Sequence, residues 1–335
     1  MTFQEIPPQI EWLIPWERLK NSGDGLVNEL RKELSSSHPL YGVEVAAIAH
    51  RGDCDDVLFA TADPLKPFAV VHLTWTRHVE LDSRWPSTAY FHGWQDWVER
   101  CLIPDHRDYF GLERIELVPV LRLEALRFAT QDRAVPSESR QDMPGEWLRF
   151  WKDSLADSGL GGLDPVVPGS EFVETRAIST NSLEKILRKL IKNCGRIDSL
   201  ADTGGGNVME GGIILRSFSG GVLIEPGCRS DFGTIQDWHA AANYRSNEWS
   251  DLWIGHPWVS VRFQDSSLLI SEAHEQGNPI AHLALSPEKL LHAIEAAKDE
   301  LRSFAAHIAR LLPGMGYGGD AEAMAHRMAG LAEDH

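Results

Sequence analysis

The sequence lacks the residue patterns that mark common metal and nucleophile sites. Its four cysteines are far apart and form no C-x-x-C pair, and no histidine pair has the H-E-x-x-H spacing, which argues against zinc motifs and a dense disulfide framework. The glycine-rich stretch 203–207 lacks the Lys-Ser/Thr pair of a phosphate loop, and SFSGG at 217–221 departs from the G-x-S-x-G nucleophile pattern. We therefore expect no bound metal, no cofactor and no catalysis by this chain.

Positive charge and long apolar runs are also scarce. Lys and Arg total 32 against 49 Asp and Glu, so the formal net charge is −17. Such a field repels nucleic-acid phosphates and anionic lipid and attracts a basic partner, although ordinary solubility explains the charge equally well. No stretch approaches the ~18 apolar residues of a membrane helix, and MTFQEIPPQIEW lacks the regions of a signal peptide. We expect a cytoplasmic protein that binds neither nucleic acid nor membrane.

What is present is the hydrophobic patterning of an α+β protein built from two modules. The first module is predicted at residues 1–108 and has the order helix, three strands, helix, with antiparallel pairing through the turn RGDCD. Apolar side chains at helical or strand spacing place its helices and strands. The predicted helices lie at 24–34, with Asp24 as N-cap, and at 91–101, and the strands lie at 42–50, 56–61 and 68–75.

A second module is predicted at residues 113–312, after a seam near Asp108 to Glu113. Short strands without crossover helices between them predict a mostly antiparallel sheet. A long helix at 287–312, capped by Ser286, is expected to lie across that sheet. Residues 313–335 are predicted to form a peripheral tail helix or a partner contact.

Tryptophan is clustered in the second module. Of the 12 tryptophans, four lie in the stretch DWHAAANYRSNEWSDLWIGHPW. Trp238 lies on a predicted helical face, and Trp253 and Trp258 lie in predicted strands, so we expect these three in the core. Trp249 follows Glu248 in a predicted loop and is the candidate for an exposed contact residue.

Two parts of the sequence carry a family resemblance. The segment DWHAAANYRSNEWSDLWIGHPWVSVRF and the following SEAHE resemble the small cytoplasmic proteins encoded beside bacterial polymorphic toxins, which include immunity proteins. VLFATADPLKPFAVVHLTWT and YFHGWQDWVERCLIPDH resemble free-standing bacterial proteins of about the first module's length. The resemblance implies a folded, acidic inhibitor that occludes a toxin domain, often a basic nuclease.

On this basis the sequence predicts an immunity-type protein that binds a cognate, basic toxin domain by steric and electrostatic blocking. Acidic rims would steer the cationic partner, and exposed aromatic side chains would supply the strongest contacts. The candidate partner-binding residues are Asp53, Asp55, Asp56, Glu248, Trp249, Asp251, Glu272 and Glu275.

Two alternatives remain open. A hydrolase or nucleotide-processing enzyme could use His256 or His274 together with Glu272, because a histidine beside a carboxylate can move protons. A pocket lined by these three side chains would favour that reading. An effector adaptor or chaperone would bind a partner without inhibiting it.

Overall fold

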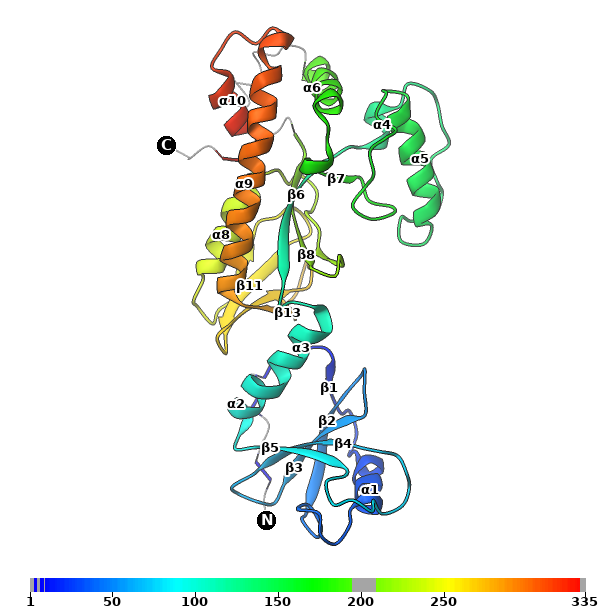
Figure 1. Ribbon diagram of the computed structural model, residues 1–335, viewed down its shortest axis with the longest axis vertical. Helices are drawn as coiled ribbons and strands as arrows, with labels where there is room; N and C mark the ends of the chain where they lie inside the picture. The colour runs from blue at the N-terminus through cyan, green and yellow to red at the C-terminus, as the bar shows by residue number, and fades with distance from the viewer. Residues whose placement is uncertain (1–2, 5–6, 9, 195–208, 332–335) are drawn as a thin grey trace.

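The computed structural model describes residues 3–4, 7–8, 10–194 and 209–331, so the glycine-rich stretch 203–207 lies outside the described residues. It contains three antiparallel sheets with helices packed on them, which confirms the α+β class. In Figure 1 the elements up to α3 form one body, and the elements from β6 onward form a second body on the other side of α3. The division at 108–113 nevertheless stays a prediction.

The first sheet has the strand order β1-β2-β3-β4-β5. Its three central strands correspond to the expected ones, whereas the two edge strands have sequences too short or too polar to show a clear period of two. The strands are β1 (Trp16–Arg18), β2 (Val45–Arg51), β3 (Asp56–Thr61), β4 (Phe68–His72) and β5 (Ser87–Phe91).

Both faces of this sheet are covered. Val57 and Val71 are cross-strand partners that pack with helix α1 (Asp24–Glu33), whereas Leu58 and Val70 belong to the apolar cluster on the opposite face. Adjacent residues of a strand point to opposite faces, so the unbroken apolar runs of β3 and β4 follow from burial on both sides.

The start of α1 differs from the sequence prediction. Its N-cap is Gly23, in the left-handed region at φ 66°, and not Asp24. A Cβ atom at position 23 would lie 2.7 Å from the Cβ atom of Ala47. Glycine is therefore required here by both its backbone conformation and its close approach to β2.

The second helix of the first module is longer than predicted. It begins with α2 (Trp94–Trp97), continues through a π-helical turn at Val98–Leu102 and ends with α3 (Ile103–Phe110). Phe91, expected on this helix, instead ends β5. Pro104 does not stop the helix, because it lies in the first turn of α3 directly after the π turn, where a missing N–H is tolerated.

The described residues of the second module form two four-stranded sheets, in the orders β7-β6-β8-β9 and β10-β11-β12-β13. All pairs are antiparallel, as the sequence predicts. The strands are β6 (Ile115–Arg122), β7 (Phe172–Glu174), β8 (Gly211–Ser217), β9 (Val222–Ile224), β10 (Ser250–Leu252), β11 (Val259–Gln264), β12 (Ser267–Ser271) and β13 (Ala281–Leu285). The described helices of this module are α4 (Ala125–Phe128), α5 (Pro144–Ala156), α6 (Thr180–Cys194), α8 (Thr234–Asn243), α9 (Pro287–Leu311) and α10 (Ala321–Met328).

Helix α9 is the centre of this module's core. Ser286 caps it as predicted, with the side-chain oxygen accepting a hydrogen bond from the Lys289 N–H. The helix packs against α8, α10 and β6 (Figure 1). Among the described helices, none combines the length and the apolar character that crossing a membrane requires.

The tail helix α10 is not peripheral, contrary to the expectation for residues 313–335. Met324 and Met328 are buried in the same cluster as Ile308 of α9. Asp320 caps α10 by accepting hydrogen bonds from two backbone N–H groups. The apolar pattern of this Ala- and Met-containing helix is weak, so the sequence does not predict that the helix is buried. Its burial depends on packing against α9.

The two modules share one apolar cluster. It joins Trp97 and Leu102 of the first module to Leu269 and Ala284 on the outer face of β12 and β13. Hydrogen bonds cross the same contact: Ala284 N–H donates to His106 Nε2 at 3.1 Å, and the Arg107 guanidinium donates to Ser267 Oγ and to the Ala284 carbonyl. Helix α3 is thus a structural part of both modules.

Candidate binding site

The acidic turn between β2 and β3 is organised around one guanidinium. Arg51 donates two hydrogen bonds to Asp53, at 2.9 and 2.8 Å, and lies 3.3 Å from Asp105 and 3.7 Å from Asp56. The Arg51 partner lowers the pKa of Asp53. Because three carboxylates surround one cation, the predicted residues Asp53 and Asp56 lie together in a region of net negative charge.

The third residue of this group, Asp55, holds an exposed tryptophan. Its Oδ1 accepts a hydrogen bond from Trp75 Nε1 at 2.9 Å, although the Trp75 side chain is exposed, at 47%. Trp75 itself lies at φ 53°, a left-handed conformation unusual for a residue other than glycine.

A buried carboxylate fixes the backbone of the same tryptophan. Glu33, at the end of α1, is fully buried and accepts hydrogen bonds from the N–H groups of Thr74, at 3.0 Å, and Trp75, at 2.6 Å. The Glu33 carbonyl also accepts from Glu80 N–H at 2.8 Å. The start and the middle of the loop after β4 are thereby tied to the end of α1, which fixes the backbone at Trp75.

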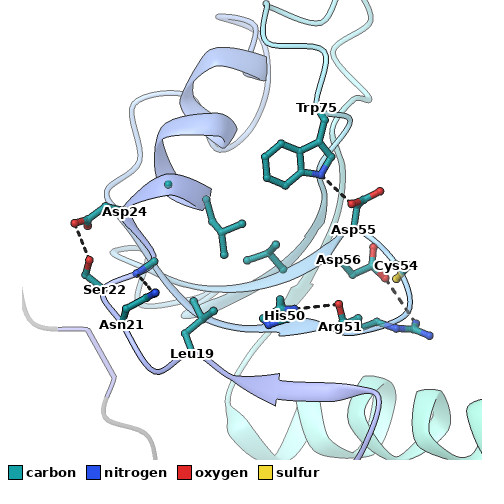
Figure 2. A pocket seen from close by; sticks show the side chains of 14 residues that line it. Leu19, Asn21, Ser22, Asp24, His50, Arg51, Cys54, Asp55, Asp56 and Trp75 are labelled. Atoms are coloured by element: carbon teal, nitrogen blue, oxygen red, sulfur yellow. Dashed lines mark hydrogen bonds and ion pairs between the residues drawn. The ribbon is translucent and has the colours of Figure 1, made fainter.

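These elements line an open pocket of about 620 Å³, which we call the Trp75 pocket. It lies between the start of α1, the turn from β2 to β3 and the Trp75 ring (Figure 2). Leu19, Leu26 and Val57 are its apolar lining, and Asp24, Asp55 and Asp56 carry its negative charge; Asn21, Ser22, His50, Arg51 and Cys54 complete the polar lining. Its volume is that of a site for a small molecule or a large side chain.

The pocket has a thiol but not an activated one. Cys54 is exposed, but its partial desolvation in the pocket, together with the negative charge of Asp56, raises the pKa of the thiol to about 11. The thiolate is the reactive form of cysteine, so Cys54 stays protonated near neutral pH. The arrangement therefore favours binding over nucleophilic attack.

The second group of predicted residues lies on the sheet β10–β13 and its turns. Glu248, Asp251, Glu272 and Glu275 are all exposed. Asp251 accepts a hydrogen bond from Ser260 Oγ at 3.0 Å, and Glu275 lies 3.8 Å from His256 Nε2. Within the described part of the chain, no hydrogen bond or ion pair joins this group to the acidic turn of the first module.

The tryptophan predictions are partly wrong. Trp238 is fully buried as expected, but Trp253 and Trp258 are exposed, at 48% and 36%. Trp249 is only partly exposed, since it packs on the cluster shared by the modules and stacks with Arg262, 4.7 Å from its ring centre. Strand β11 begins at Val259, which leaves Trp258 before the strand and outside the core.

His274 of the hydrolase alternative is not part of a nucleophilic triad. His274 Nε2 lies 2.9 Å from Ser260 Oγ, but the serine donates its proton to Asp251 and is itself buried. In a nucleophilic triad the histidine lies between serine and carboxylate. His256 instead pairs through its backbone with Cys228 and places its ring edge-on to Trp258.

Sequence reasoning missed Trp75 and Glu33. Trp75 continues the apolar run FAVVHLTW and therefore resembles a strand residue, while Glu33 resembles any surface glutamate of a helix. They are joined only by a hydrogen bond between residues 42 positions apart in the chain.

Among the described residues, no three His, Cys, Asp or Glu side chains are grouped as metal ligands. No family model matches the chain, and no curated protein or solved structure is detectably similar to it.

Proposed function

We propose that this chain is an immunity-type protein that binds a basic toxin domain and neutralises it by occlusion. The observation that carries the proposal is Trp75, an exposed aromatic side chain held by Asp55 and Glu33 beside the acidic turn. Tryptophans of this kind dominate binding energy in protein interfaces, and rigidity before binding lowers the entropic cost of association. Neutralisation of this kind would take place in the bacterial cytoplasm.

Charge supports the same proposal. The formal net charge of −17 favours encounter with a cationic protein and disfavours binding to nucleic acid. The acidic turn concentrates part of that charge beside the apolar contact residue. A polar rim around a central aromatic side chain is a common interface arrangement.

The test is co-expression of the full chain with the product of the neighbouring gene, scoring growth and co-purification. We expect rescue of growth, a stable complex and an association rate that falls as salt rises. Binding without rescue would support an adaptor instead. No binding at micromolar concentration would refute the proposal.

A charge variant makes the test specific. Replacing the three aspartates of the acidic turn by asparagine should lower the association rate about tenfold at low salt. The control removes three exposed carboxylates around α5, at the other end of the molecule in Figure 1, and should change the rate little. The test variant is Asp53→Asn, Asp55→Asn and Asp56→Asn, and the control is Asp132→Asn, Glu138→Gln and Glu146→Gln.

A further inference from the structure

The Trp75 pocket has the chemistry of a cation-binding site with an aromatic wall. Figure 2 shows the Trp75 ring beside Asp55 on one side of the pocket, with Asp24 on the side formed by α1. Leu26 and Val57 contribute apolar lining to the same pocket. An aromatic face, apolar sides and carboxylates together suit a cationic group on an aliphatic stem.

Two carboxylates of the pocket each have an oxygen that can accept hydrogen bonds from such a ligand. Among the described contacts, Asp55 uses only Oδ1, for the indole, and Asp24 uses only Oδ2, for Ser22 Oγ. The cation already present, Arg51, is matched by its own partners Asp53 and Asp105. An incoming cation would therefore meet unmatched negative charge.

We infer that the Trp75 pocket binds an arginine side chain presented by the basic partner protein. The identity of that partner rests on the proposed function. A planar guanidinium can stack on an indole face and make paired hydrogen bonds to a carboxylate, which an ammonium group cannot do. Because the Trp75 ring is held in place by Asp55 and its backbone by Glu33, the pocket exists before the ligand arrives.

The test follows the Trp75 indole N–H resonance by NMR of the ¹⁵N-labelled full chain. The resonance is assigned, among the 12 tryptophans, by its loss in Trp75→Phe. The probes are acetyl-Gly-Arg-Gly-amide and the same peptide with lysine or with uncharged citrulline. We expect saturable shifts with arginine, at least about tenfold weaker binding of lysine and none of citrulline.

Matched variants locate the binding. Trp75→Ala and Asp55→Asn should each weaken arginine-peptide binding about tenfold or more. Trp253→Ala removes a tryptophan of nearly equal exposure, 48% against 47%, and should leave binding unchanged. Circular dichroism checks that each variant is folded, and Trp75→Phe keeps an aromatic wall and should bind more tightly than Trp75→Ala.

Three outcomes would overturn the inference: citrulline binding as well as arginine, undiminished binding in Trp75→Ala, or no saturable shift at tens of millimolar arginine peptide. Equal binding of lysine would overturn the guanidinium preference. Failure here is separable from failure of the proposed function. A toxin neutralised equally well by wild type and Trp75→Ala contradicts only the pocket, whereas arginine binding without any toxin binding contradicts only the function.

Discussion

Acidification tests the contact between the modules, because His106 lies there without charge. The ring is fully buried, with Nδ1 2.6 Å from the Ile14 carbonyl and Nε2 accepting from Ala284 N–H. Nδ1 therefore carries the proton, and the neutral ring makes hydrogen bonds with both the Ile14 carbonyl and the Ala284 N–H. Burial lowers the pKa of His106 from 6.5 to about 4.

The size of the pH effect follows from this shift. The unfolded chain binds a proton at His106 as pH falls through 6.5, whereas the folded chain does so only near 4. Stability from this group is therefore fully present above pH 6.5 and is lost as pH falls toward 4. At about 1.4 kcal/mol per pKa unit, the loss is on the order of 3 kcal/mol.

The assay is urea unfolding of the wild type and His106→Gln at steps from pH 7.5 to pH 4.5. Glutamine does not titrate, so subtracting the two curves removes the contribution of the carboxylates. We expect His106→Gln to be less stable at pH 7.5 by about 1–3 kcal/mol, because the Ala284 N–H loses a well-placed acceptor. The difference should shrink steadily below pH 6.5. Parallel curves over the whole range would refute the reasoning.

Three further predictions concern single side chains. Trp151→Phe should destabilise the fold by about 1–2 kcal/mol more than Trp238→Phe in urea unfolding, because Trp151 Nε1 donates to the Leu123 carbonyl at 2.7 Å, whereas Trp238 Nε1 has no partner among the described residues. Met324→Ala should cost about 2–5 kcal/mol and expose the chain end to limited proteolysis, since this side chain is fully buried; an unchanged unfolding midpoint would contradict a core role for α10. The alkylation rate of Cys54, measured by mass spectrometry, should reach half its maximum near pH 11, and a half-maximal rate near pH 9 would show an ordinary thiol.

Much of the fold follows from local signals. Helix α9 is 25 residues long, begins after a capping serine and carries a long apolar stripe. In the hairpin β8–β9, a turn separates two apolar runs. Such features require no knowledge of distant residues. The edge strands β1 and β5 escaped prediction because their sequences are too short or too polar to show a clear period of two. The burial of α10 escaped it because that burial depends on packing against α9.

The candidate site was predictable only in its acidic half. An Asp-rich turn between two strands is visible in the sequence. Two of its residues, Asp55 and Asp56, line the Trp75 pocket. The exposure of Trp75 depends on Glu33, and that of Trp253 and Trp258 depends on where the strands begin and end. Hydrophobic character alone therefore assigned these tryptophans to the wrong environment.

The apolar cluster shared by the modules bears on how this chain can be divided. A fragment ending at Phe110 would expose Trp97 and Leu102, and the complementary fragment would expose Leu269 and Ala284. Each piece would carry an uncovered hydrophobic face that fits the other. Separately expressed halves should consequently aggregate alone and reassemble when mixed, so the molecule is better regarded as two complementing fragments than as two independent building blocks.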